Sequence, residues 1–283
     1  MKNLGYYNGI IDEIEKMTIP MCDRVCFFGD GIYDATYSRN YNIFALNDHV
    51  DRFFNSAKLL KINIPHTKSQ LKALLIDMVE KMDTGENFVY FQATRGLSPV
   101  RHHLFSPTEK ANIWINIFHK KIEDVYRKVN LITVEDTRFF HCNIKTLNLI
   151  PSVMASQKAK EMNCDEAIFH RNGRVTECSH SNVHIIKDGK FITPPTDNLI
   201  LAGVARKRLI LACNRLNIPV LEKPFTVKTL LSADEVIISS AGQLCLSAST
   251  VDKTAVGNKA PQILSALQKE VLNEFIKETD MLK

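Results

Sequence analysis

Three tight-turn signals separate short strands, and they constrain the fold more than any other feature of the sequence. Asn8-Gly9, Asn172-Gly173 and Asp188-Gly189 each lie between two short apolar segments. A two-residue hairpin turn needs positive φ at its central positions, which Asn-Gly and Asp-Gly tolerate well. The pattern therefore predicts antiparallel or barrel-like sheet and argues against a doubly wound parallel fold.

The first 120 residues combine strand and helix patterns. Asn47 is placed to cap a helix whose apolar residues recur at helical spacing up to Leu60. The same spacing returns from Thr67 to Met82. Alternating or β-branched apolar runs predict strands at 33–38, 43–46, 88–94 and 113–118. We therefore expect a small α+β domain over residues 1–120.

A charged stretch at residues 121–128 precedes the apolar run 129–134 and is the predicted linker. A chain of 283 residues is long enough for about two domains, so a larger domain is expected over 129–283. Its pattern predicts helices at 151–162, 203–216 and 260–279 and strands at 166–170, 182–186 and 236–239. The predicted fold class is a two-domain α+β protein with a barrel-like second domain.

Charge and cysteine usage exclude several classes of protein. The 36 basic and 31 acidic residues are intermixed, whereas a nucleic-acid surface needs a basic stripe interleaved with aromatic residues. Seven cysteines at irregular spacing indicate reduced thiols and a cytoplasmic location, and none of them forms a zinc-ligand pattern. No signal peptide and no apolar run of membrane-spanning length occurs. We therefore expect no metal, no nucleic acid and no membrane partner.

Four segments carry side chains suited to chemistry, and each has an ordinary structural alternative. Lys145 lies among apolar residues, either as a reactive amine or as a surface lysine whose ammonium reaches water. Glu177 follows a turn and belongs on or beside a strand, as a functional or a salt-bridged carboxylate. The segment 101–103, Arg-His-His, would bind a carboxylate or form a solvated loop. The glycine turn at 28–33 exposes Tyr33 or only reverses the chain.

Six segments taken in order carry a family resemblance. They are Phe28–Tyr33, His49–Phe53, Gln92–Gly96, Ile144–Asn148, Thr176-Glu177 with Ser181–Val183, and Leu201–Arg206. Together they resemble the fold type IV, or class IV, aminotransferases, which bind pyridoxal 5′-phosphate (PLP). The likeness extends from Tyr7 to about Ser240 and is greatest to bacterial D-amino-acid aminotransferases.

The resemblance implies a cofactor site and a homodimer with PLP in the cleft between two domains. It implies that Lys145 holds PLP covalently and transfers the substrate proton. It implies that Glu177 accepts a hydrogen bond from the pyridine nitrogen and keeps it protonated. The implied phosphate site consists of the Arg52 guanidinium and the backbone N–H groups at Val204 and Ala205, where a helix opens. The Ser240 hydroxyl and the position of Ala241 complete it.

The resemblance also implies that Tyr33, Arg101 and His103 bind the substrate α-carboxylate, as in the D-specific enzymes. The implied reaction is ping-pong transfer of an amino group between D-amino acids such as D-alanine and 2-oxo acids such as 2-oxoglutarate. A 4-amino-4-deoxychorismate lyase and a branched-chain L-amino-acid aminotransferase are the alternatives within the superfamily. A scaffold protein that keeps the fold without turnover is the alternative from another class.

Several residues depart from the D-specific pattern. Ala205 and Ala241 stand where those enzymes have threonine hydroxyls, and Asp34 replaces a glutamate. His180 replaces a serine, and Arg101 aligns only with one residue inserted at Val100. These differences bear on substrate identity more than on PLP binding.

Overall fold

The computed structural model describes residues 3–280 and forms two compact units. Unit 1 consists of the chain up to Lys121, the segment Ile144–Asn148 and the chain from Ile276 onward. Unit 2 consists of Ile122–Asn143 and Leu149–Phe275. The domain boundaries predicted from the sequence, with a linker at 121–128, stay a prediction. In the structure, the segment Ile144–Asn148 clusters with the first unit.

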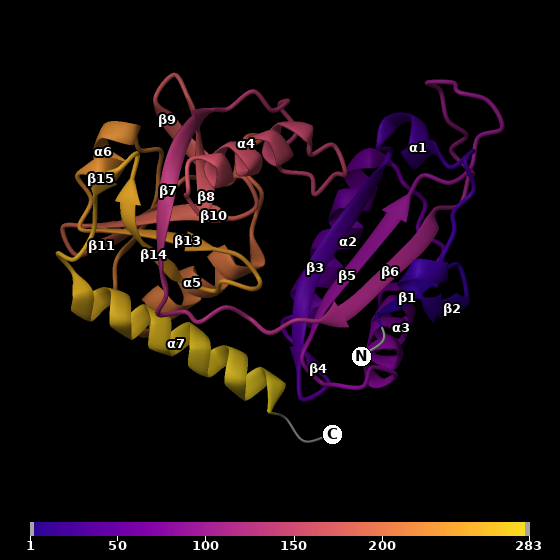
Figure 1. The fold of residues 1–283 in the computed structure, drawn as a ribbon, viewed down its shortest axis with the longest axis horizontal. Coiled ribbons are helices and arrows are strands. Elements are labelled where there is room, and N and C mark those ends of the chain that lie inside the picture. The colour runs from indigo at the N-terminus through magenta and orange to yellow at the C-terminus, as the bar shows by residue number, and fades with distance from the viewer. Residues whose placement is uncertain (1–2, 281–283) are drawn as a thin grey trace. The chain divides into compact units, whose positions relative to one another are not determined.

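Unit 1 is built on a six-stranded antiparallel sheet of order β2-β1-β6-β5-β3-β4 (Figure 1). Asn8 and Gly9 have φ of 48° and 99°, so the predicted hairpin turn is confirmed. The strands are β1 (Leu4–Tyr7), β2 (Ile10–Glu13), β3 (Gly31–Arg39), β4 (Asn42–Ile43), β5 (Asn87–Thr94) and β6 (Asn112–His119).

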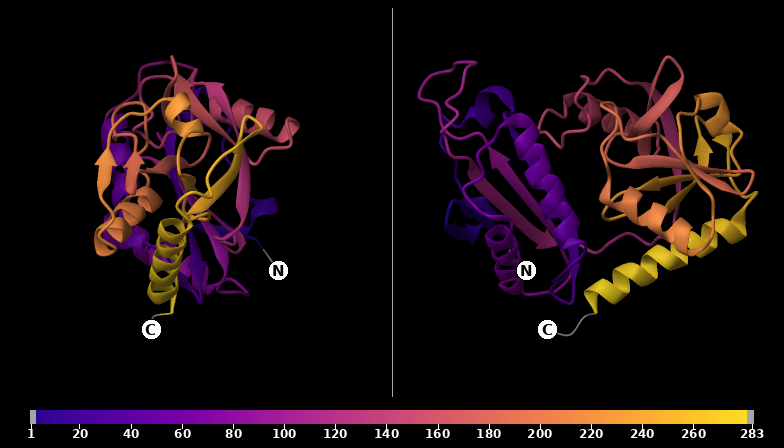
Figure 2. Two further views of the ribbon diagram at one scale, coloured as in Figure 1. Left: turned by 90° about the vertical axis from the view of Figure 1, so that its left-hand side faces the viewer. Right: turned by 180° about the vertical axis from the view of Figure 1, so that it is seen from behind.

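Helices α2 (Leu46–Leu60) and α3 (Lys68–Glu80) cover one face of this sheet, which the rear view in Figure 2 shows from the helix side. Their apolar residues pack with alternate residues of the central strands, including Phe53, Leu71, Phe91 and Ile115. Two short helices, η1 (Ile14–Lys16) and α1 (Arg24–Phe28), precede β3. The face opposite α2 and α3 carries the other alternate residues of each strand.

Two details near the start of α2 were predicted wrongly. The strand expected at 43–46 ends at Ile43, and Ala45, not Asn47, is the N-cap of α2. The Ala45 N–H donates to Glu278 Oε2 at 3.2 Å, a residue from the far end of the chain. This long-range bond holds the backbone at Ala45, two residues before the N-cap that the local pattern predicts. The helix expected from Thr67 is confirmed, and Thr67 forms a capping box with Gln70.

Unit 2 contains a nine-stranded, strongly curled sheet of order β12-β11-β10-β13-β14-β7-β8-β9, with β15 beside β14. The Cys178 N–H donates to the Ser181 carbonyl at 2.8 Å, so the chain turns from the last strand in this order to β10. The barrel-like sheet is thereby confirmed as a half-barrel. Its strands are β7 (Lys128–Glu135), β8 (Glu166–Arg171), β9 (Arg174–Cys178), β10 (Asn182–Lys187), β11 (Lys190–Thr193), β12 (Val220–Glu222), β13 (Glu235–Ser239), β14 (Leu246–Val251) and β15 (Thr254–Ala255).

Four helices accompany the curled sheet, namely α4 (Ile150–Glu161), α5 (Val204–Arg215), α6 (Val227–Leu231) and α7 (Pro261–Thr279). The three long ones confirm the helices predicted at 151–162, 203–216 and 260–279. Asn172, Gly173, Asp188 and Gly189 all have positive φ, as their turns require. Within residues 3–280, no helix is long and apolar enough to cross a membrane.

Candidate active site

Lys145 of unit 1 is fixed against β3 by backbone hydrogen bonds. The Tyr33 N–H donates to the Lys145 carbonyl at 3.0 Å, and the Lys145 N–H donates to Ser56 Oγ at 3.2 Å. The Lys145 Nζ atom lies 4.3 Å from the centroid of the Tyr33 ring. The electron-rich face of that ring attracts the ammonium. The structure thus places two predicted site residues, Lys145 and Tyr33, in direct contact.

A buried charge network from β3 and α2 contains the third predicted residue, Arg52. The Arg52 Nε and Nη2 atoms donate to the two oxygens of Asp34, each at 2.8 Å. His49 Nδ1 lies 2.7 Å from Asp34 Oδ1. Burial disfavours the ionised carboxyl, but the charge of Arg52 and the contact with His49 outweigh it and hold the pKa of Asp34 well below its usual range. The aspartate, although shorter than the glutamate it replaces, therefore still forms a bidentate pair with Arg52.

His49 occupies the inner end of this network. Burial lowers the pKa of His49 below its ordinary value and outweighs the charge and hydrogen bond of Asp34, which act in the opposite direction, so the imidazole is neutral near pH 7. Its Nε2 atom is buried and has no hydrogen-bond partner among the residues that the structure describes. A buried polar atom without a partner is a feature that a bound polar group would satisfy.

Glu177 of unit 2 lies on β9 with 6 % of its surface exposed. Its Oε2 atom accepts from Asn182 Nδ2 at 3.2 Å and from the Leu201 N–H at 3.0 Å. Its Oε1 atom accepts from Arg138 Nη1. The side chain is thus held by a guanidinium, an amide and a backbone N–H.

Arg138 is the partner of Glu177 that sequence reasoning missed. Its guanidinium also forms an ion pair with Asp136 at 2.9 Å. Burial alone would lower the pKa of Arg138, but hydrogen bonds with Asp136 and the charge of Glu177 raise it above the ordinary value. The only signal in the sequence was a pair of opposite charges just after the apolar run 129–134.

The first turn of α5 contains the predicted phosphate-binding residues Val204 and Ala205. Gly203 is the N-cap and offers no capping side chain, so the N–H groups of the first turn remain suited to an anion. A Cβ atom at Gly203 would lie 1.9 Å from Asn182 Oδ1. This turn therefore packs against the same asparagine that donates to Glu177.

Ser240 and Ala241 follow β13 in unit 2. The Ser240 hydroxyl donates to Gln243 Oε1 at 3.1 Å. Ala241 is half-buried and carries no hydroxyl. Neither residue has a hydrogen bond to Val204 or Ala205 in the part of the chain that the structure describes.

Arg101 and His103 lie in the exposed loop after β5 and share one platform. The Arg101 guanidinium lies 4.9 Å from the centroid of the Phe28 ring, and the His103 ring centroid lies 5.2 Å from it. Between residues 3 and 280, no hydrogen bond, ion pair or ring contact joins either residue to Tyr33 or Lys145. The predicted carboxylate-binding residues thus form two groups within unit 1.

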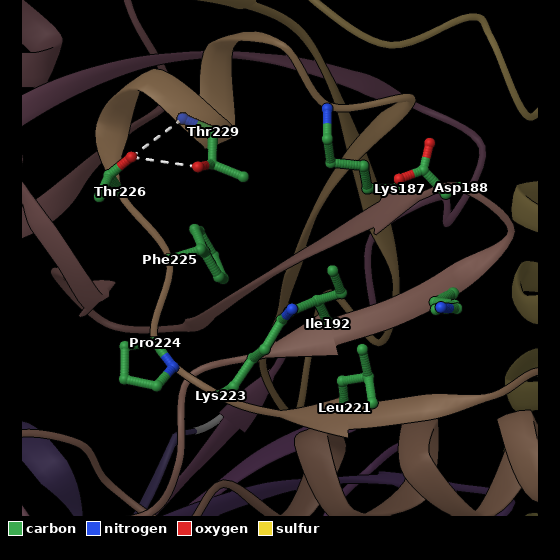
Figure 3. A pocket seen from close by; sticks show the side chains of 10 residues that line it. Lys187, Asp188, Ile192, Leu221, Lys223, Pro224, Phe225, Thr226 and Thr229 are labelled. Carbon is green, nitrogen blue, oxygen red and sulfur yellow. Dashed lines mark hydrogen bonds between the residues drawn. The ribbon is translucent and has the colours of Figure 1, made fainter.

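A pocket of about 350 Å³ in unit 2 includes none of the predicted site residues (Figure 3). Apolar side chains such as Ile192 and Phe225 form part of its wall, with Lys187 and Lys223 beside them. Lys187 already donates to Ser232. In the described part of the chain, no three His, Cys, Asp or Glu side chains are grouped to hold a metal ion.

Comparison with known proteins identifies the family of the chain. The family model described as amino-transferase class IV matches residues 31–251. The D-alanine aminotransferase of Listeria monocytogenes serotype 4b (strain F2365) is 35 % identical over 275 residues, which cover 95 % of this chain and 95 % of that protein. The D-alanine aminotransferase of Staphylococcus haemolyticus is 34 % identical over 274 residues, covering 96 % and 97 %.

Solved structures show the same fold. The branched-chain aminotransferase of the thermophilic archaeon Thermoproteus uzoniensis, solved with norvaline, has a TM-score of 0.84 at 22 % identity, covering 97 % of this chain and 96 % of that one. The branched-chain amino acid aminotransferase of Escherichia coli has a TM-score of 0.88 at 19 % identity, covering 99 % and 96 %. At these identities the likeness concerns the fold alone.

Proposed function

The chain belongs to the class IV aminotransferase family, and from this premise we propose that it transfers an amino group between D-amino acids, D-alanine among them, and 2-oxo acids such as 2-oxoglutarate. The observation that carries the proposal is the 35 % identity to a D-alanine aminotransferase over 95 % of both chains. The geometry around Lys145 and Glu177 supports it, because each functional group is held by several partners.

The residues present fit PLP as the cofactor. Arg52 and the uncapped turn at Val204 and Ala205 supply cationic and N–H donors for a phosphate. Glu177 supplies a carboxylate for a protonated ring nitrogen, and Lys145 supplies a primary amine for an aldehyde. When bound, PLP accepts the electron pair that remains after the substrate Cα–H bond breaks.

Lys145 and Glu177 perform the two tasks that such a reaction requires of the protein. The Lys145 Nζ atom would take the proton from the substrate Cα as a general base and then, as a general acid, donate it to the cofactor carbon that receives the amino group. Tyr33 keeps that amine at a defined place on the sheet. Glu177 holds a proton on the ring nitrogen by accepting its hydrogen bond, and Arg138 keeps the carboxylate charged for this purpose.

Arg101 and His103 are proposed to bind the substrate α-carboxylate, together with Tyr33. Arginine presents parallel donors that match a carboxylate, and the Phe28 platform limits the positions open to its guanidinium. The side of the site on which the carboxylate binds decides which enantiomer directs its Cα–H bond toward Lys145. The D-specificity therefore depends on this loop.

A homodimer is proposed from the sheet face of unit 1 that α2 and α3 leave uncovered. Alternate residues of β1, β3, β5 and β6 place half-buried aromatic rings there, including Tyr7, Tyr33, Phe88, Tyr90, Trp114 and Phe118. Three ring pairs, at centroid distances of 6.3, 5.6 and 5.0 Å, join these residues across neighbouring strands. An aromatic surface of this kind is typical of protein interfaces.

Two measurements test the function. We expect the purified protein with PLP to convert D-alanine and 2-oxoglutarate into pyruvate and glutamate with ping-pong kinetics. L-leucine and 4-amino-4-deoxychorismate are the competing substrates, and a preference for either would overturn the D-specific proposal. Borohydride reduction and peptide mass spectrometry should find the pyridoxyl label on Lys145, and a label on another lysine would contradict its role.

A further inference from the structure

We propose that Arg24 is a positioning residue that holds the loop carrying Arg101 and His103 in the conformation that binds the substrate carboxylate. The inference rests on the proposed function, because it takes these two residues as the carboxylate-binding groups. Neither the family likeness nor the predicted site residues include Arg24.

Arg24 binds three successive carbonyl groups of the loop. Its Nη1 atom donates to His102 O at 2.7 Å and to Leu104 O at 3.2 Å, and its Nη2 atom donates to His103 O at 3.3 Å. The fourth bond, from Nε to Asp30 Oδ2, is 2.8 Å long. Arg24 is only 4 % exposed although the loop residues that it binds are exposed. A buried guanidinium with four acceptors restricts the loop backbone more than water would.

The base of the loop is joined to the same short segment. The Arg24 N–H donates to Gly96 O at 3.0 Å, and the Ser98 N–H donates to Cys22 O at 2.8 Å. Asp23 caps α1 through the Val25 N–H and also accepts from Thr94 Oγ1 at 2.8 Å, at the end of β5. The backbone around Arg24 is therefore fixed to the sheet before its side chain reaches the loop.

Helix α1 presents two loop contacts on one side. Arg24 and Phe28 are four residues apart, so they are neighbours on the helix surface, and the Arg24 guanidinium lies 5.0 Å from the Phe28 centroid. Arg101 and His103 rest on the same ring. One helical turn thus binds the loop backbone with a guanidinium and supports the loop side chains with an aromatic ring.

A second arginine, Arg95, keeps Asp30 paired when Arg24 is replaced. Arg95 Nε donates to Asp30 at 2.8 Å, and Arg95 Nη1 donates to Leu60 O at 2.9 Å. The Arg95 guanidinium also lies 3.8 Å from the centroid of Phe105. Asp30 therefore retains a cation without Arg24, and the core under α2 and α3 loses no contact. We expect Arg24→Met to fold and to affect the loop.

The first experiment compares Arg24→Met with wild-type holoenzyme by steady-state kinetics and hydrogen exchange. We expect KM for D-alanine and 2-oxoglutarate to rise about tenfold or more, with a smaller change in kcat and unchanged PLP labelling at Lys145. Amide exchange of residues 98–105 should become faster. Arg39→Met is the matched control, since Arg39 forms an ion pair with Asp280 elsewhere in unit 1. It should leave both readouts as in the wild type.

A double-mutant cycle separates positioning from general stability. If Arg24 acts through Arg101, Arg24→Met should add little to the rise in KM that Arg101→Ala already causes. Additive effects, or a wild-type KM in Arg24→Met, would overturn the inference. If wild-type protein has no D-alanine transaminase activity, the proposed function fails and the inference falls with it. Loop exchange unchanged by Arg24→Met in an active enzyme overturns the inference alone.

Discussion

At the scale of single residues, an arginine accompanies each functional carboxylate. Asp34 is paired with Arg52 and Glu177 with Arg138, and all four side chains are buried or nearly so. A buried carboxylate without a cation would take up a proton or be excluded from the interior. These pairs therefore hold the carboxylates of Asp34 and Glu177 in the interior, where the proposed chemistry uses them. The neutral His49 beside Asp34 contributes no charge of its own.

Replacing the carboxylate by its amide tests the role of Glu177. We expect Glu177→Gln to retain PLP but to lose transamination by about 100-fold or more, which corresponds to roughly 2.7 kcal/mol of barrier. The amide preserves the shape and the bond to Leu201, but it does not hold a proton on the ring nitrogen. Single-turnover kinetics and the absorbance of bound PLP measure the two properties separately. Near-wild-type turnover would count decisively against the role.

At the scale of elements, the start of α5 connects two parts of the proposed cofactor site. Asn182 on β10 donates to Glu177 and to Leu201 O, and its Oδ1 atom lies under Gly203. Only a residue without a side chain permits this approach, because a Cβ atom would overlap Asn182 Oδ1. The φ of Gly203 is −66°, which any residue can adopt. The glycine is required for space and not for backbone conformation.

A methyl group at Gly203 should therefore disturb PLP binding. We expect Gly203→Ala to weaken PLP affinity about tenfold or more, because the new Cβ forces the turn and Asn182 apart. Equilibrium dialysis or fluorescence titration with PLP measures the change. Gly189→Ala is the control, because nothing lies within 4 Å of a Cβ there, although its φ of +70° is strained for alanine. Equal PLP affinity in Gly203→Ala and wild type would refute the packing argument.

At the scale of the whole molecule, we expect two buried histidines to make stability depend on pH. His184 is buried between Thr193 Oγ1 at 2.9 Å and Ser239 Oγ at 2.8 Å. Burial and the charge of Arg206 lower its pKa well below the ordinary value. The unfolded chain binds a proton near pH 6.5 and the folded chain does not, so stability is fully present above that pH and is lost as pH falls below it.

The free energy of unfolding should thus decrease between pH 7.5 and pH 5.5. Each such histidine contributes up to about 1.4 kcal/mol per pH unit below 6.5, and His49 acts in the same direction. We expect His184→Gln to show a shallower decrease than the wild type in urea unfolding at several pH values. A variant with the same slope would show that His184 is not a source of the pH dependence.

Local features of the chain were predictable because neighbouring residues encode them. The positive φ values at Asn8 and Gly9 and the periodicity of the long helices depend on torsion angles and on residues a few positions apart. The order of six short motifs along the chain likewise indicated the family and pointed to Lys145 and Glu177. None of these inferences needed to know which distant segments meet.

Tertiary structure decided the partners of the functional groups. Glu278 sets the start of α2, Arg138 pairs with Glu177 across 39 positions, and Arg24 binds a loop carbonyl 78 positions later. An exposed salt bridge and a buried one look alike in a sequence, since their difference lies in burial and in the packing of strands remote along the chain. The residue types that perform the chemistry are therefore readable from the sequence, whereas the charges that hold them in place emerge only when the sheets have formed.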